Sequence, residues 1–177
     1  GLKELVESTN KKFSKDILSP LTITLGDEFQ GVLNSVSTGI DLLFHLEEEL
    51  LITEPDFKLH YVLLLGEIET EINPDIAYEM MGKMLSSKKR NRKRFRFKLQ
   101  NKEQTEQLSK IFEVLDTIIL NWKKEDYPLI LDMINNDNNS EVGDLHDKNR
   151  DQIWKRRKTL MINEYNLLKD FIKTYIK

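Results

Sequence analysis

The sequence predicts an α+β domain followed by an all-α helix-turn-helix. Three observations support this class: a Gly-Asp turn between alternating segments, further strands separated by amphipathic helical segments, and a basic C-terminal region after a polar linker. The 177 residues are 39% hydrophobic and 32% charged, which is a globular composition. Cysteine is absent, so disulfide and thiolate chemistry are excluded.

The first part of the chain predicts helix, hairpin, helix. Residues 2–17 have helical periodicity that ends before a proline. Residues 21–34 predict a hairpin, because the two-residue turn Gly26-Asp27 separates two strand-like segments. Ser37 is a suitable N-cap for a helix over about 38–51, which has a leucine-rich face.

The middle of the chain predicts two further strands. Phe57 to Ile68 reads as a long strand, and its apolar run from Tyr61 to Leu65 is typical of a central strand buried on both faces. The strand at 95–99 alternates aromatic with basic residues. Helices are expected at 75–85, 104–122 and 128–134.

This order of elements fits a palm of the ferredoxin-like type over residues 1–134. One strand before residue 1 would complete such a sheet, so the first strand is expected to be missing and the N-terminus incomplete. Residues 135–139 contain only Asn and Asp and predict a linker. Residues 140–177 then form the helix-turn-helix domain.

The helix-turn-helix is predicted from spacing. Ser140 can cap a short helix, Gly143 allows close helix crossing, and a turn at 147–149 precedes a helix that starts near Arg150. A recognition helix uses Arg, Lys and Gln for bases and phosphates. The expected DNA-binding residues are Arg150, Gln152, Lys155, Arg156, Arg157 and Lys158. The alternative is a basic amphipathic helix that packs on the palm or on another subunit.

Charge is distributed unevenly, although the net charge is only −3. Residues 83–98 hold nine basic and no acidic residues, and residues 148–177 hold nine basic and three acidic ones. Such clusters attract polyanions. Arg94 and Arg96, held on a strand, are candidate nucleotide or phosphate ligands, whereas the run 88–94 is either a phosphate contact or a solvated loop.

Residues 22–31, TITLGDEFQG, resemble the signature of the SatD family of bacterial proteins. The resemblance extends over most of the chain. Its later matches are Gly66-Glu67-Ile68-Glu69-Thr70, Ile72-Asn73-Pro74, Arg94-Phe95-Arg96-Phe97 and Ile153-Trp154-Lys155-Arg156-Arg157. It implies a divergent nucleotide-cyclase-like palm joined to a helix-turn-helix.

The resemblance to cyclase-type palms also implies a metal site. There the hairpin aspartate and a first-strand aspartate hold two metal ions over a nucleotide triphosphate. Asp27 matches the hairpin aspartate and Glu28 the neighbouring acid, with Mg or Mn as the implied metal. The first-strand aspartate has no counterpart here, and an ordinary solvated turn is the alternative for Asp27. Glu67, Glu69 and Glu71 are either a cation-binding face or a solvated strand end.

Two functions are therefore expected from the sequence. The first is a cytoplasmic DNA-binding regulatory protein whose palm senses a nucleotide or metal, or dimerises. The alternative is a Mg- or Mn-dependent nucleotide-processing enzyme with Asp27 as metal ligand. A palm that serves only as scaffold is a third reading. The partners implied are DNA, a nucleotide and a second copy of the chain, but no membrane, because no apolar run is long enough to span one.

Overall fold

A computed structural model describes residues 1–24, 26–66 and 93–176. The described residues form an α+β structure of seven α-helices and two two-stranded sheets. They divide into two compact units, one of residues 1–58 with 118–177 and one of residues 59–117. This division differs from the predicted boundary at 135–139, because residues 140–177 belong to the same unit as the N-terminal elements.

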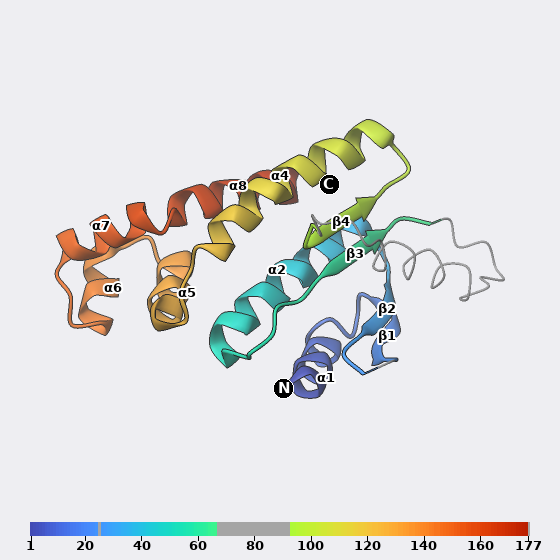
Figure 1. The fold of residues 1–177 in the computed structure, drawn as a ribbon, viewed down its shortest axis with the longest axis horizontal. Helices are drawn as coiled ribbons and strands as arrows, with labels where there is room; N and C mark the ends of the chain where they lie inside the picture. The colour runs from blue at the N-terminus through green and yellow to red at the C-terminus, as the bar shows by residue number, and fades with distance from the viewer. Residues whose placement is uncertain (25, 67–92, 177) are drawn as a thin grey trace. The chain divides into compact units, whose positions relative to one another are not determined.

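The first unit begins with helix α1 (Leu2–Lys12) and the predicted hairpin, formed by β1 (Ile17–Ile23) and β2 (Phe29–Leu33) (Figure 1). The helix ends earlier than predicted, because Ile17 already pairs with Leu33 across the antiparallel sheet.

The tip of the hairpin is wider than predicted. The Thr24 N–H donates to the Glu28 carbonyl oxygen at 3.0 Å, while β1 ends at Ile23 and β2 begins at Phe29, so the connection is longer than Gly26 and Asp27 alone. Gly26 has φ of 61°, a left-handed conformation that glycine adopts without a steric penalty. The turn chemistry was therefore identified correctly from the sequence, although the loop length was not.

Helix α2 (Val36–Thr53) supplies much of the core of this unit. Its N-cap is Ser35, whose hydroxyl accepts the Thr38 N–H at 3.0 Å, and not the predicted Ser37. Leu46 is fully buried, and Phe44 is 1% exposed. A helix that is apolar on so much of its surface requires neighbours on several sides.

Those neighbours come from the C-terminal region. Helix α5 (Tyr127–Asn135) follows the short 3₁₀ helix η1 (Lys124–Asp126), and both α5 and α8 (Ile162–Tyr175) pack against α2. The buried Tyr165 of α8 makes an edge contact with Phe44 at 6.2 Å between ring centres and a tilted contact with Trp122 at 5.0 Å. This shared core explains why residues 140–177 do not form a separate unit.

Helices α6 (Asn139–Leu145) and α7 (Arg150–Thr159) have the helix, turn, helix order predicted from the sequence (Figure 1). Asn138 caps α6 and Asn149 caps α7, so the predicted cap Ser140 lies inside its helix. A Cβ atom on Gly143 would overlap the Lys148 carbonyl oxygen. The predicted need for a small residue at this crossing is therefore met.

The second unit contains a parallel strand pair, β3 (Tyr61–Leu64) with β4 (Phe95–Lys98), and most of helix α4 (Lys102–Leu120). Phe95 and Phe97 face Phe112 of α4, with ring centres 5.1 and 4.7 Å apart. The aromatic-basic alternation thus predicted the buried side of β4 correctly, since both phenylalanines are buried.

The expectation for residues 57–68 is corrected by β3. Within the described residues the strand covers only Tyr61–Leu64, and all four of its residues are half-buried. The reason is that β4 is the one strand paired with it in that part of the chain. The predicted helix at 75–85 and the basic run up to residue 92 lie outside the described residues.

The described strands form two separate sheets, so a single ferredoxin-like sheet remains a prediction. No helix among residues 1–24, 26–66 and 93–176 is long and apolar enough to cross a bilayer.

Candidate nucleic-acid interface

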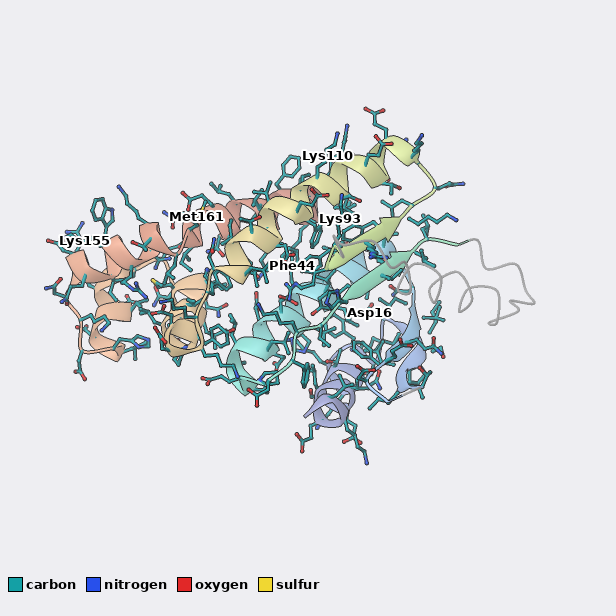
Figure 2. The ribbon with its side chains drawn as sticks, viewed as in Figure 1. Asp16, Phe44, Lys93, Lys110, Lys155 and Met161 are labelled. Carbon is teal, nitrogen blue, oxygen red and sulfur yellow. The ribbon has the colours of Figure 1, made fainter. Side chains whose placement is uncertain are left out.

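Helix α7 has one buried side and one basic, exposed side. Ile153 and Arg157 are buried, whereas Arg150, Gln152, Lys155 and Lys158 are exposed. Figure 2 labels Lys155 on this helix. Most of the predicted DNA-binding residues are therefore brought together on the accessible side of one element.

Arg157 has a different role from the one predicted. It is 4% exposed, and its guanidinium donates to the carbonyl oxygens of Met133 and Asn136, both at 2.7 Å, and to the Asn139 side-chain oxygen at 2.9 Å. Asp137 lies 3.7 Å away, and burial lowers the pKa of the guanidinium. Arg157 thus fastens α7 to the segment between α5 and α6, and it is not on the accessible surface.

Two further predicted residues already have partners within the molecule. Arg156 is half-exposed and pairs with Asp126 of η1. The Gln152 side-chain oxygen accepts the Asn149 N–H at 2.9 Å, which completes the capping box of α7. The Gln152 amide group keeps its two N–H donors, whereas Arg156 would have to exchange its carboxylate partner for a phosphate.

Lys155 and Lys158 lie in the second half of α7, and Trp154 lies between Lys158 and Arg150 along the helix. Trp154 is 48% exposed, and the Lys158 ammonium lies 3.9 Å from the centre of its indole ring. This cation-π contact holds a cation next to an exposed aromatic surface. The Trp154–Lys158 pair was not recognised from the sequence, although the i, i+4 spacing predicts such a contact.

The first half of α7 is less suited to a polyanion. Three exposed carboxylates lie within six residues of its start in the sequence, Asp144 of α6, Asp147 of the turn and Asp151 of α7, against the two exposed cations Lys148 and Arg150. The carboxylates oppose a phosphate backbone near the N-terminal end of α7. The electrostatically favourable surface is therefore the stretch from Trp154 to Lys158.

The predicted metal ligands Asp27 and Glu28 lie exposed at the hairpin tip. The described residues contain no group of three or more His, Asp or Glu side chains arranged to hold a metal ion. Mg²⁺ is usually bound through one or two carboxylates together with substrate phosphates, so a metal ion at this tip remains a prediction. Glu67, Glu69 and Glu71 lie outside the described residues.

The predicted phosphate ligands Arg94 and Arg96 differ in placement. Arg94 is 5% exposed, and its Nε donates to the Asp116 carboxylate at 2.8 Å, with the guanidinium 4.7 Å from the Phe95 ring centre. Arg96 is half-buried, and its Nε contacts the Lys93 carbonyl oxygen at 3.4 Å. The strand alternation predicted that Arg94 and Arg96 share an exposed face. The structure differs, because Arg94 is buried.

Arg94 and Asp116 line a hollow of about 390 Å³ between β4 and α4, together with Phe112 and Thr117. Among the described residues that line it, the charges balance, because Lys93 with Glu113 adds a second ion pair beside Arg94 with Asp116.

The SatD family model matches residues 1–152. The chain belongs to the SatD family. No curated protein and no solved structure matches the chain. The matched region ends at Gln152. The basic residues in the second half of α7 therefore lie outside the part of the chain that matches the family model.

The role of Arg157 was missed for a specific reason. Its position four residues after the buried Ile153 places both side chains on the same side of a helix. That spacing was available in the sequence, but the basic composition of α7 favoured an exposed arginine. A buried arginine needs acceptors, and the carbonyls of Met133 and Asn136 are not identifiable from sequence.

Proposed function

We propose that this SatD family member is a DNA-binding regulatory protein and that α7 provides the DNA contact. The observation that carries the proposal is the exposed group of Arg150, Trp154, Lys155 and Lys158 on one short helix. The helix is held rigidly, by the Asn149 cap at its start and by Arg157 on its buried side.

Lys155 and Lys158 are the expected phosphate ligands. Each ammonium that neutralises a phosphate releases counterions, so the affinity should depend strongly on salt. Trp154 lies next to Lys158 and is expected to pack against a deoxyribose. The amide donors of Gln152 and the guanidinium of Arg150 are the candidates for base edges.

The three carboxylates at the start of α7 limit the contact. Asp144, Asp147 and Asp151 disfavour deep insertion of that end into a groove. Backbone contacts should therefore contribute more than base contacts, and binding should be only weakly sequence-selective in the absence of a second copy or a ligand.

The second unit is the candidate sensor of this regulator. Its hollow beside Arg94 and Phe112 suits a small ligand that combines a ring with balanced polar groups. A nucleotide or metal as that ligand remains a proposal. The alternative of a Mg- or Mn-dependent nucleotide-processing enzyme rests on Asp27 and Glu28, which have no third ligand among the described residues.

The test is fluorescence anisotropy with a labelled duplex of random sequence at low salt. The double variant Lys155→Ala/Lys158→Ala should bind at least tenfold more weakly than the unaltered chain. The matched control is Lys102→Ala/Lys110→Ala, which removes the same charge from exposed positions on α4 and should leave affinity nearly unchanged. Equal affinities for all three proteins, or no binding by any, would refute the proposal.

A further inference from the structure

Helix α8 exposes apolar side chains along one side. We call this set the α8 stripe: Met161, Leu167, Leu168, Phe171 and Tyr175. Leu167 is 70% exposed, Phe171 52% and Met161 40%, while Leu168 and Tyr175 are half-buried. The Phe171 and Tyr175 rings stack with centres 5.8 Å apart and planes 15° apart. Met161 lies at the junction between α7 and α8 (Figure 2).

Rotation of α8 would not bury the stripe, because the other side of the helix is fixed to α2. Lys169 pairs with Glu48, and Lys173 pairs with Asp41 at 2.7 Å. Tyr165 and Ile172 of the same helix are 1% and 0% exposed. Lys169 and Lys173 are therefore used inside the unit, whereas the exposed side of α8 carries Leu167 and Phe171, which is unusual for a solvated helix face.

We propose that the stripe is the contact surface of a homodimer, covered by the α8 stripe of a second copy of this chain. Within α8, positions 164, 168, 171 and 175 follow one another at intervals of four, three and four residues, the spacing of the a and d positions of a coiled coil, and Met161 precedes them as the N-cap. A helix with this spacing is complementary to another copy of itself. Self-complementarity about a twofold axis is the requirement of an isologous interface.

The charges on α8 favour an antiparallel pair. Glu164 is the one ionised residue within this a/d series. In a parallel pair the two Glu164 carboxylates would face each other across the contact and repel. In an antiparallel pair each Glu164 carboxylate lies opposite Tyr175 of the second copy. The two helix dipoles also attract each other, because the N-terminal end of each helix lies beside the C-terminal end of the other.

The area of the stripe suits a reversible dimer. Phenylalanine buries ~150–250 Å² when covered, so the half-exposed Phe171 together with the other members offers roughly 400–500 Å² per copy. Two copies then bury about 1,000 Å², which is near the lower limit of specific interfaces. We therefore expect a dimer that dissociates at micromolar concentration. Its formation does not depend on whether α7 binds DNA.

The first test is sedimentation velocity over a concentration series. The unaltered chain should shift from monomer to dimer, and Phe171→Glu should stay monomeric with an unchanged circular dichroism spectrum. Leu145→Glu is the matched control, since Leu145 is 68% exposed but lies on α6, and it should dimerise normally. A monomer at every concentration would overturn the proposal, as would a dimer that Phe171→Glu leaves intact.

The second test uses the absence of cysteine from the chain. With Glu164 opposite Tyr175, a Leu168→Cys variant places one thiol of each copy within two residues of the twofold axis, and a short bis-maleimide should cross-link the dimer. Glu164→Cys should not cross-link, because in the antiparallel pair the two thiols are far apart. Cross-linking of Glu164→Cys but not of Leu168→Cys would contradict the proposed antiparallel pairing. If Phe171→Glu instead lowers the unfolding temperature of a wholly monomeric protein, the stripe is covered within one chain and the proposal fails.

Discussion

Replacing Arg157 with methionine tests the structural role of this residue directly. Methionine fills a similar volume but cannot donate to the carbonyl oxygens of Met133 and Asn136 or to the side chain of Asn139. A hydrogen bond from a charged donor contributes about 1.5–3 kcal/mol, and a buried acceptor left unsatisfied costs about 1–3 kcal/mol. The Met133 bond is buried, and the other two are partly reached by water.

The three bonds are therefore not additive, and we expect Arg157→Met to lower the free energy of unfolding by about 3 kcal/mol. For a chain of this size the unfolding temperature should fall by roughly 6–12 °C. The assay is urea and thermal unfolding followed by circular dichroism. Lys155→Met, on the exposed side of the same helix, should change stability by less than about 0.5 kcal/mol.

A loss below about 1 kcal/mol for Arg157→Met would refute the role assigned to the guanidinium. Arg157→Lys is a further check, because lysine keeps the charge but not the planar arrangement of donors. Arg157→Lys should unfold at a temperature between those of the unaltered chain and Arg157→Met. At temperatures where it is folded it should still bind DNA, since Arg157 is buried and does not face the ligand.

Three other predictions concern single residues. Gly143→Ala should destabilise by about 1–3 kcal/mol in denaturant titrations, because the added methyl overlaps the Lys148 carbonyl oxygen, and a stabilised variant would contradict that close crossing. Burial and the nearby Lys12 ammonium lower the pKa of His45, so the folded state takes up the proton at lower pH than the unfolded chain. Stability should therefore be complete above about pH 6.5 and decline below it, and this decline should be smaller in His45→Gln. Acrylamide should quench Trp154, and bound duplex should reduce that quenching; unchanged quenching would place the DNA elsewhere.

Local features of the fold were predictable where a few neighbouring residues decide them. The hairpin depended on Gly26, the crossing of α6 and α7 on Gly143, and the inward side of β4 on Phe95 and Phe97. Each of these follows from backbone conformation or from period-two alternation. None requires knowledge of a distant partner.

The domain boundary was not predictable, because it depends on contacts far apart in sequence. The polar segment 135–139 has the composition of a linker, but Arg157 donates to the Asn136 carbonyl oxygen and the Asn139 side-chain oxygen within it, and Lys169 pairs with Glu48 of α2. Such ion pairs leave no periodic signal. The length of β3 was overestimated for a related reason. An apolar run alone does not show how many strands pair with a segment.

The placement of the candidate DNA-binding residues was predicted in part, whereas their binding to DNA stays a prediction. The sequence placed Arg150, Lys155 and Lys158 on one helix, and the structure exposes all three. The sequence did not predict that Arg94 is buried against Asp116. The prediction extended the strand alternation to position 94, but β4 begins at Phe95.

The most direct test of DNA binding by α7 is the salt dependence of affinity for a duplex. The logarithm of the binding constant should fall linearly with the logarithm of salt concentration, and Lys155→Ala/Lys158→Ala should reduce the slope by about two. Lys102→Ala/Lys110→Ala should leave the slope unchanged. A slope that is the same in all three proteins would show that α7 does not contact phosphates and would contradict the proposed function.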